Sequence, residues 1–252
     1  MPENKDILDF SDNSPIFLAI LEIRYDDPNL KDIQKFSEFK NQITSLFPNS
    51  QKQISSQLKL DNLLEGQTTI QVQNQKIDCF LYSSKDKLNE FTISLNRFNY
   101  KQNGKYTNFE DFVENIKKVW EIHYPLLKDI TISGISLRVF NKIEIKEEVK
   151  DPSDYFNISI QATPDLISGS VTNFSIRYIM KNLIEKTHSI IALSLEDRIF
   201  NTYPFVLDID VHNDIPIKND LKLIWDNFEL LRIEKDRLFN SLLTEKTKKI
   251  IL

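Results

Sequence analysis

The segment 130–146, ITISGISLRVFNKIEIK, decides the fold class because apolar and polar residues alternate along it. A period of two residues indicates a β-strand, and one apolar face opposite one polar face is typical of an antiparallel sheet. We therefore predict one long strand here. Its apolar face holds Ile135, Leu137, Val139, Ile143 and Ile145, interrupted by Asn141, and its other face holds Ser136, Arg138, Phe140, Lys142, Glu144 and Lys146.

Further strands are predicted on both sides of this segment. Toward the C-terminus, the patterns near 157–162, 170–178, 189–195 and 205–212 indicate short strands. Toward the N-terminus, residues 15–25 are apolar on both faces, which predicts a central strand covered front and back. Residues 54–100 return to a period of two and predict three or four meandering strands, with a short turn at Asn74-Gln75.

Three segments repeat apolar residues at helical spacing. The first runs from Leu30 to Phe47 and ends before Pro48. The second follows Thr107-Asn108-Phe109-Glu110, which predicts a capping box between Thr107 and Glu110, and ends at Pro125. The third covers 219–246 and predicts one long helix, or two with a kink near 234–237.

The order of these elements predicts an α+β protein with antiparallel meandering sheets and three to four helices. Two similar halves would account for the order: 15–125, and 130–252 ending in a long helix, packed as one unit. Residues 1–14 hold four acidic residues against one lysine and are expected to form a flexible acidic leader. A parallel doubly wound sheet is excluded because it needs strands and helices to alternate.

Composition excludes several enzyme classes. The 252 residues include only four glycines, and they are too far apart for a phosphate-binding loop, a dinucleotide-binding turn or a nucleophile elbow. Three histidines and the single Cys79 give no zinc spacing and no intrachain disulfide. We expect no metal and no cofactor. Because these common catalytic motifs are missing from the sequence, a protein that is not an enzyme is favoured.

Charge and hydropathy bear on partners and compartment. The 32 basic and 37 acidic residues give a net charge of −5, which argues against nucleic-acid binding over the whole chain. The N-terminal residues lack a basic start followed by an apolar run, and no stretch is apolar enough to span a membrane. We therefore expect a cytoplasmic protein without membrane contact.

Asp208, Asp210 and His212 form the first candidate site, because they share one face of the strand predicted at 205–212. Side chains two positions apart on a strand are roughly 7 Å apart, a spacing closer to paired-metal or acid–base chemistry than to one shared ion. The alternative is that the three residues form the solvent-facing side of a half-exposed strand.

Arg138, Phe140 and Asn141 are further candidate binding residues. An amide on an apolar strand face costs about 1–3 kcal/mol unless it is hydrogen-bonded, so Asn141 must contact either a neighbouring backbone or a ligand. Arg138, together with Lys142 and Lys146, makes a basic stripe around Phe140. This stripe would bind an acidic partner, or its cations would form ion pairs on a solvated face.

The C-terminal segment 232–249 carries an excess of cations and gives a candidate partner surface at Lys246, Lys248 and Lys249. It would contact an acidic protein, or nucleic acid through this segment alone. The alternative is that the cations accompany the C-terminal end of a helix, which attracts positive charge. His123 and Cys79 are interpreted as packing residues, a buried histidine and a small buried thiol.

Together these pieces resemble a sporadically distributed family of uncharacterised bacterial proteins of about 250 residues with an Arg-Tyr-x-Asn signature. The signature position here is Arg138-Val139-Phe140-Asn141, so valine replaces the motif tyrosine. The tryptophan that the family carries before Phe112 is also absent. The remaining matches, in order, are Pro15-Ile16, Leu21-Glu22-Ile23-Arg24-Tyr25, Leu95-Asn96-Arg97, Tyr106, Phe109–Phe112, Asp154-Tyr155-Phe156 and Leu207-Asp208-Ile209-Asp210. The resemblance brings no established activity, but the family's patchy distribution is similar to that of toxin–antitoxin and phage-defence genes.

Three functions remain open at this point. The first is a non-enzymatic protein-binding or regulatory subunit of a bacterial accessory system of the toxin–antitoxin or antiviral-defence type, whose partner is the product of a neighbouring gene. The second is a divalent-cation-dependent hydrolase or nuclease that uses Asp208 and Asp210, with Arg138 holding a phosphate. The third is a module that binds a small ligand within a curved sheet.

Overall fold

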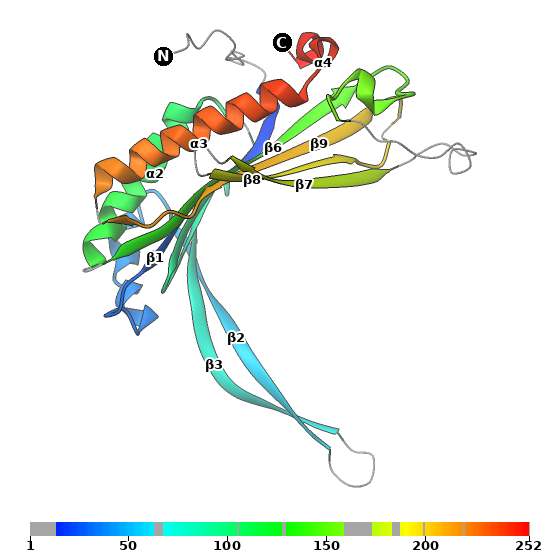
Figure 1. Ribbon diagram of the computed structural model, residues 1–252. Helices are drawn as coiled ribbons and strands as arrows, with labels where there is room; N and C mark the ends of the chain where they lie inside the picture. Colours follow the sequence, from blue (N-terminus) through cyan, green and yellow to red (C-terminus); the bar gives the residue numbers. More distant parts are fainter. Residues whose placement is uncertain are drawn as a thin grey trace.

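The computed structural model describes residues 14–62, 68–104, 106–127, 130–158, 173–182, 187–198, 200–218 and 220–251, without the side chains of 56–62 and 68–75. Ten strands form one sheet in the order β2-β3-β4-β5-β1-β6-β9-β8-β7, with β10 paired to β6. All strand pairs are antiparallel. The α+β class predicted from the sequence is confirmed (Figure 1).

The strands are β1 (Ile16–Asp26), β2 (Asn49–Asn62), β3 (Thr68–Ser83), β4 (Asn89–Ser94), β5 (Arg97–Asn103), β6 (Thr131–Ile145), β7 (Phe174–Asn182), β8 (Thr187–Leu195), β9 (Tyr203–Asn213) and β10 (Ile217–Lys218). The helices are α1 (Phe39–Ile43), α2 (Phe109–His123), α3 (Leu221–Leu242) and α4 (Glu245–Ile251). Single 3-10 turns lie at η1 (Ile33–Phe36), η2 (Tyr124–Leu126) and η3 (Pro152–Asp154). The predicted leader 1–14, apart from Ser14, and most of the strand predicted at 157–162 lie outside the described residues.

The sheet is continuous because β1 pairs with β6 at its centre. On each side of this pair, the last strand of a meander returns beside the central strand, β5 beside β1 and β9 beside β6. The segments predicted as two halves therefore contribute to one sheet. Glu22 pairs with Ser136 at the middle, and Arg24 and Arg138 each follow this pair by two residues.

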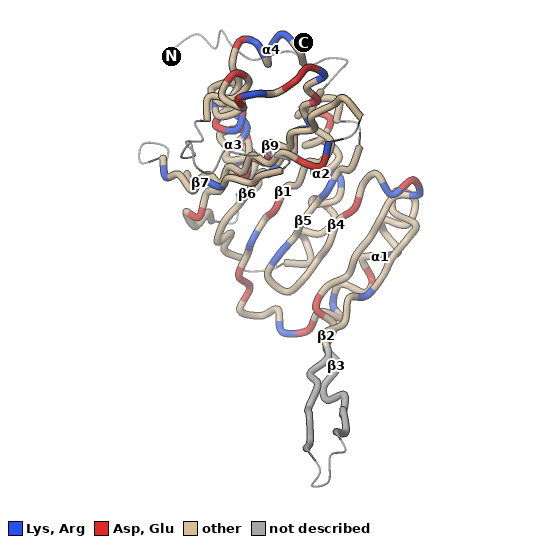
Figure 2. Tube along the Cα trace, turned by 90° about the vertical axis from the view of Figure 1, so that its right-hand side faces the viewer, with Lys and Arg blue, Asp and Glu red and all other residues tan. Residues whose placement is uncertain are grey.

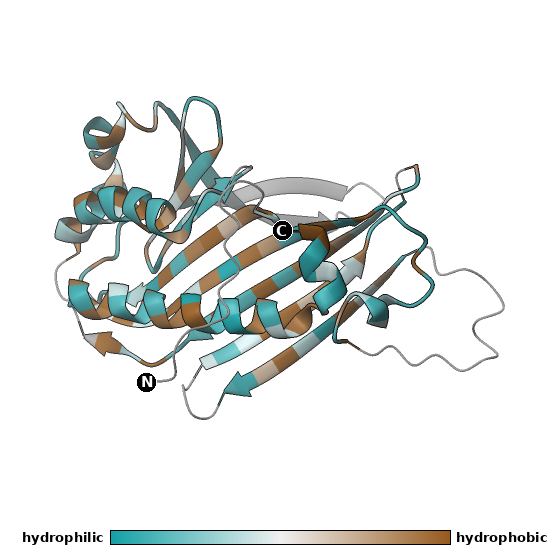
Figure 3. Cartoon of the chain, turned by 90° about the horizontal axis from the view of Figure 1, so that it is seen from above, coloured by the Kyte–Doolittle hydropathy of each residue, from teal (hydrophilic) through white to brown (hydrophobic). Residues whose placement is uncertain are grey.

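The helices α2 and α3 pack on the same face of the sheet. Helix α3 lies over β6 and β9, and the Trp120 ring of α2 contacts Tyr25 of β1 and Phe98 of β5. Apolar bands run along the strands beneath the helices (Figure 3). The alternate residues of β1, from Leu18 to Arg24, are only half-buried on the opposite face. The prediction that β1 is covered front and back is therefore wrong, because its second face is open.

The segment predicted as a helix from Leu30 to Phe47 is instead divided into η1 and α1. Its apolar residues are buried as the periodicity indicated. The break allows Phe36 and Phe39 to pack edge-on or tilted around the His123 ring, at centroid distances of 4.9 and 5.9 Å. Tertiary packing thus overrides the helical preference of the segment.

The turn predicted at Asn74-Gln75 is wrong, because β3 runs through both residues. Opposite them, the register steps from Ser56–Gln75 to Gln57–Gln73, which leaves Asn74 as the extra residue of a β-bulge. A residue type typical of turns here marks a local irregularity within a strand pair.

Two local features predicted for the helices differ in the structure: the N-terminal cap of α2, and the kink near 234–237. Helix α2 is capped by Asn108, whose Oδ1 accepts from the Asp111 amide at 2.7 Å, and not by Thr107 with Glu110. Near the C-terminus α3 continues through 234–237 without a kink. The chain breaks instead at Leu243, which is buried and extended because it pairs with Phe156.

His123 lies in the aromatic core between α2 and the sheet, as its packing interpretation predicted. The Tyr25 hydroxyl donates its hydrogen to the Ser94 carbonyl at 2.8 Å, so it accepts from His123 Nε2 at 3.1 Å. His123 Nδ1 then carries a lone pair, and it has no hydrogen-bond partner. Burial lowers the pKa of His123 to about 3, because the charged ring would lose its hydration.

We expect the folded state to lose stability as the pH falls below 6.5, the ordinary pKa of His123, because the unfolded chain binds a proton there that the folded chain does not bind until about pH 3. Between pH 7 and pH 5 this histidine should account for about 2 kcal/mol of the loss. Denaturant unfolding at both pH values, compared with His123→Phe, measures it. An equal loss in the variant would contradict the assignment.

Candidate functional site

The open face of the sheet carries a row of ion pairs centred on Arg138. Arg138 donates from Nε and Nη2 to both oxygens of Asp208, at 2.9 and 2.7 Å. Its Nε also lies 4.0 Å from Asp210 Oδ2. The register explains the contacts, because Arg138 pairs with Asp210 and Phe140 pairs with Asp208. The hydrogen bonds to Asp208, with the charge of both carboxylates, raise the pKa of Arg138.

Two aromatic rings border this arginine. The Arg138 guanidinium lies 4.5 Å from the centroid of the Phe140 ring, a cation–π geometry. Phe140 is tilted against Phe17 at 6.1 Å. Phe17 is 39% exposed, so one apolar surface remains open beside the charged groups.

The row continues through two histidines. His212 Nε2 lies 3.1 Å from Asp210 Oδ2, and its ring stacks on that of His188 with centroids 5.4 Å apart. His188 Nε2 lies 2.6 Å from Asp214 Oδ2. Asp210 Oδ1 is buried without a hydrogen bond. The histidines therefore connect the carboxylates of β9 to that of Asp214.

Arg24 links this row to the N-terminal half of the sheet. Its Nη2 donates to Asp214, and its Nε lies 3.4 Å from Glu22, which in turn lies 3.4 Å from Arg97. Burial raises the pKa of the Asp214 carboxyl, but the hydrogen bond and charge of Arg24 and the two nearby histidines outweigh it, so the pKa lies below its ordinary value. Ion pairs thus extend across five neighbouring strands.

Gly134 makes the Arg24–Asp214 contact possible. A Cβ at this position would lie 2.5 Å from Arg24 Nη2, 2.9 Å from Arg24 Cζ and 3.0 Å from Asp214 Oδ1. The guanidinium therefore crosses β6 where that strand lacks a side chain. A close approach, not a turn, requires this glycine.

The structure brings together five of the six predicted binding residues: Arg138, Phe140, Asp208, Asp210 and His212. Asn141 does not belong with them, because it is 1% exposed on the helix-covered face. Its Nδ2 donates to the Leu207 carbonyl at 3.0 Å, so it braces the neighbouring strand and is corrected to a structural residue.

Two residues of the row, His188 and Asp214, were not found from the sequence. No local pattern connects them to His212, because the pairing of β8 with β9 is set by the tertiary fold. Arg24 did leave a signal, since each half opens with a long strand that contains an arginine among apolar residues.

The predicted C-terminal surface is largely paired within the chain. Lys246 Nζ lies 2.7 Å from Glu147 and donates to Tyr155 Oη at 2.9 Å, and Lys248 Nζ donates to Glu245 at 2.7 Å. Lys249 also lies on α4. Of these lysines only Lys246 joins α4 to the body of the protein, because Lys248 pairs within α4 and Lys249 is exposed.

Cys79 is not the buried thiol expected. It is half-exposed, and its Sγ donates to Gln53 Oε1 at 3.0 Å. The position lies at the outer end of the sheet, where β3 leaves its neighbour β4. Burial and the nearby Asp78 charge raise the pKa of the thiol, which disfavours the reactive thiolate.

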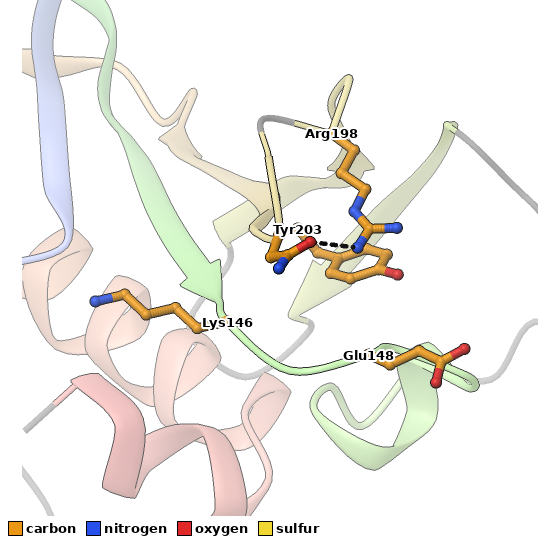
Figure 4. Close-up of a pocket in the computed structure, with 5 residues that line it drawn as sticks. Lys146, Glu148, Arg198 and Tyr203 are labelled. Carbon is orange, nitrogen blue, oxygen red and sulfur yellow. Dashed lines mark hydrogen bonds between the residues drawn. The ribbon is translucent and has the colours of Figure 1, made fainter.

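A surface hollow of about 340 Å³ lies at the far end of β6 and β9. Arg198 stacks on Tyr203 at 4.6 Å and donates to Asn201 at 3.2 Å. Lys146 and Glu148 extend away from these groups (Figure 4). The lining side chains do not converge on one point, so the hollow offers no set of ligands to a single bound group.

The carboxylates of the open face lie beside neighbouring side chains rather than grouped around one point. Among the described residues, no three His, Cys, Asp or Glu side chains are grouped to hold a metal ion. Asp208 is instead bound by Arg138, and Asp210 lies beside Arg138 and His212. Basic and acidic positions are interspersed along the sheet (Figure 2).

We expect the double substitution Asp208→Ala with Asp210→Ala to lower the free energy of unfolding by about 1–2 kcal/mol, because Arg138 and His212 lose their partners. Denaturant unfolding measures the change. The same pair of substitutions in an Arg138→Met background should cost less. An unchanged stability together with loss of a cation-dependent hydrolysis would instead support the hydrolase hypothesis.

Gly134→Ala should destabilise the fold by about 1 kcal/mol, because the new methyl group displaces Arg24 from Asp214. The matched control is the same substitution in an Arg24→Ala background, where the space is free and the cost should largely vanish. Thermal unfolding of the four proteins measures this coupling. Equal costs in both backgrounds would show that the arginine is not what the methyl group meets.

The comparisons with known proteins add no family. No family model matches the chain, and no curated protein matches its sequence. None of the helices in the described residues is both long and apolar enough to cross a membrane. Inference about function therefore depends on the geometry of the sheet and its side chains.

Proposed function

We propose that the chain is a non-enzymatic protein-binding subunit whose partner contacts the arm formed by β2 and β3 and the open face of the sheet. The arm is the observation that carries the proposal. Among the described residues, 54–62 of β2 and 68–77 of β3 pair only with each other, because β4 pairs with β3 at Cys79–Ser83. The arm extends away from the rest of the sheet (Figure 1).

An isolated two-stranded ribbon is marginally stable in water, because it has no second layer against which to bury side chains. The register of the arm sets Leu58 opposite Val72 and Leu60 opposite Ile70. Ile54, at its base, is 53% exposed. Apolar residues paired this way are typical of a ribbon that packs on another surface, and a partner protein would supply that surface.

The composition of the arm favours protein over nucleic acid. Residues 54–77 contain two lysines, Lys59 and Lys76, and two acidic residues, Asp61 and Glu65. The segment therefore has no net charge. A ribbon that binds nucleic acid needs cations to neutralise phosphates, so this one is better suited to a protein surface.

The C-terminal helix supports the same proposal. Leu223, Leu230 and Ile233 of α3 are each more than 40% exposed, at 43, 47 and 43%. Their spacing of seven and three residues places them on one side of the helix. This surface lies on the side of the molecule opposite the open face, so a partner that contacts both would reach around the sheet.

The proposed cellular role rests on the resemblance to the family of uncharacterised bacterial proteins with the Arg-Tyr-x-Asn signature. Within the proposal, the chain is a cytoplasmic subunit of a toxin–antitoxin or antiviral-defence system, and its partner is the product of a neighbouring gene. The ion-paired open face agrees with a binding role, because its carboxylates are already engaged within the chain.

Replacing 56–75 with Asn-Gly tests the role of the arm. Ser55 and Lys76 are opposite each other in the register, so a two-residue turn can join them. We expect the neighbouring gene product to co-purify with the full chain and about ten-fold less with the shortened one, because the arm supplies much of the interface. Affinity purification after co-expression, quantified by mass spectrometry, measures the difference.

The control is the melting temperature, which should change little because the aromatic residues at the base of the arm, Phe80 and Tyr82, remain in the core. Lys248→Gln with Lys249→Gln serves as a matched surface variant that leaves the arm intact. Undiminished co-purification with the shortened chain, or a full chain that never associates with a partner, would contradict the proposal.

A further inference from the structure

We infer that β7, the free edge of the sheet, is a second binding site, where an extended acidic segment of a partner protein adds as a further strand. The inference goes beyond the arm and does not depend on it. In the order of the sheet, β7 is the end opposite β2. Its nine residues pair with β8 from Phe174–Leu195 to Asn182–Thr187.

The edge lacks most of the features that prevent strand addition. Proteins usually protect edge strands by making them short, by charged side chains, by a proline or by a β-bulge. β7 is longer than the usual five or six residues, contains no proline, and pairs with β8 without a shift in register. No other strand of the described residues pairs with its outer side. Within the part of the chain that the structure describes, no strand takes up the backbone N–H and C=O groups along this side, so a new strand can pair with them.

Apolar side chains gather on the same edge. Tyr178, Ile179 and Met180 are consecutive and are 40, 65 and 47% exposed. Successive side chains of a strand point to opposite faces, so these three present apolar surface on both sides of β7. An added strand would cover them from both faces.

The charge on β7 specifies what kind of strand fits. Arg177 and Lys181 share the open face with Ile179, and their neighbours on β8 are Ala192 and His188. Neither cation has an ion-pair partner among the described residues. On the same face, Asp208 of β9 pairs with Ala192 and is bound by Arg138, and Asp214 is in contact with His188 and Arg24. Among the described residues, these two cations, roughly 13 Å apart along the edge, are therefore not neutralised by a carboxylate.

This charge argues against a second copy of the chain. Pairing two β7 strands edge to edge would gather Arg177 and Lys181 of both copies on one face, and like charges on adjacent strands repel. The same cations favour a strand with Asp or Glu at alternate positions. Its intervening residues would be β-branched or aromatic and would lie beside Ile176, Tyr178 and Met180 on the other face.

The test uses a labelled peptide, Thr-Glu-Val-Glu-Val-Glu-Val-Thr, and the full chain in fluorescence anisotropy. Two control peptides replace every Glu with Lys, or the central Val with Pro. We expect the Glu peptide to bind at least about ten-fold more tightly than either control, because it alone has both the charge and the backbone donors. Equal binding of the three peptides, or no binding of the Glu peptide at millimolar concentration, would overturn the inference.

The variant Arg177→Glu with Lys181→Glu tests whether the peptide binds at β7. Both positions are exposed, so the fold should be retained, and circular dichroism checks it. We expect the variant to reverse the preference toward the Lys peptide, and an unchanged preference would overturn the inference. The chain with the shortened arm should bind the Glu peptide as the full chain does, so a failure of the arm and a failure of the edge give different results.

Discussion

The antiparallel pairing of β1 with β6 is the constraint on which the rest of the structure depends. Its register sets Leu21 opposite Leu137 and Ile23 opposite Ile135, all buried. Each such side chain contributes roughly 1.5–3 kcal/mol when it leaves water. This apolar band lies on one face at the centre of the sheet, and α2 and α3 cover it from that side. The two meanders extend outward from the central pair in both directions.

The same pairing fixes the chemistry of the open face. Residues alternate between faces, so a strand that turns Leu137 and Val139 toward the helices must turn Arg138 and Phe140 to the other side. A slip of one residue would bury Arg138 among the helices, which makes the register strongly specified. The ion pairs across the open face follow from that register. They bring the carboxylates of Asp208 and Asp214 into contact with Arg138 and Arg24.

The two ends of the sheet differ, and both bear on recognition. At one end β2 and β3 continue beyond β4 as an arm, and at the other β7 ends the sheet as a regular edge. In a continuous sheet, every strand except the two edge strands has both sides of its backbone hydrogen-bonded to neighbouring strands. Proposals for partner binding therefore fall on the arm and the edge, where strand pairing and side-chain packing are incomplete.

The sequence by itself determined the long strands β6 and β9, the helix α2 and the apolar faces of these three elements. The period of two along 130–146 and 205–212 correctly predicted which residues of β6 and β9 are buried, and the helical spacing did the same for α2. These features are local, because the alternation of side chains along a strand or helix is set by backbone geometry. Asn74, by contrast, is a turn-type residue that the pairing of β2 with β3 places in a bulge.

Only the tertiary structure decided which faces meet. The stacking of His188 on His212, the contact of Arg24 with Asp214 over Gly134, and the use of Asn141 to brace Leu207 all join residues distant in sequence. No local pattern specifies such contacts, because they depend on the order and register of strands within the sheet. That order is the outcome of burying all the apolar faces together, which no single segment can do alone.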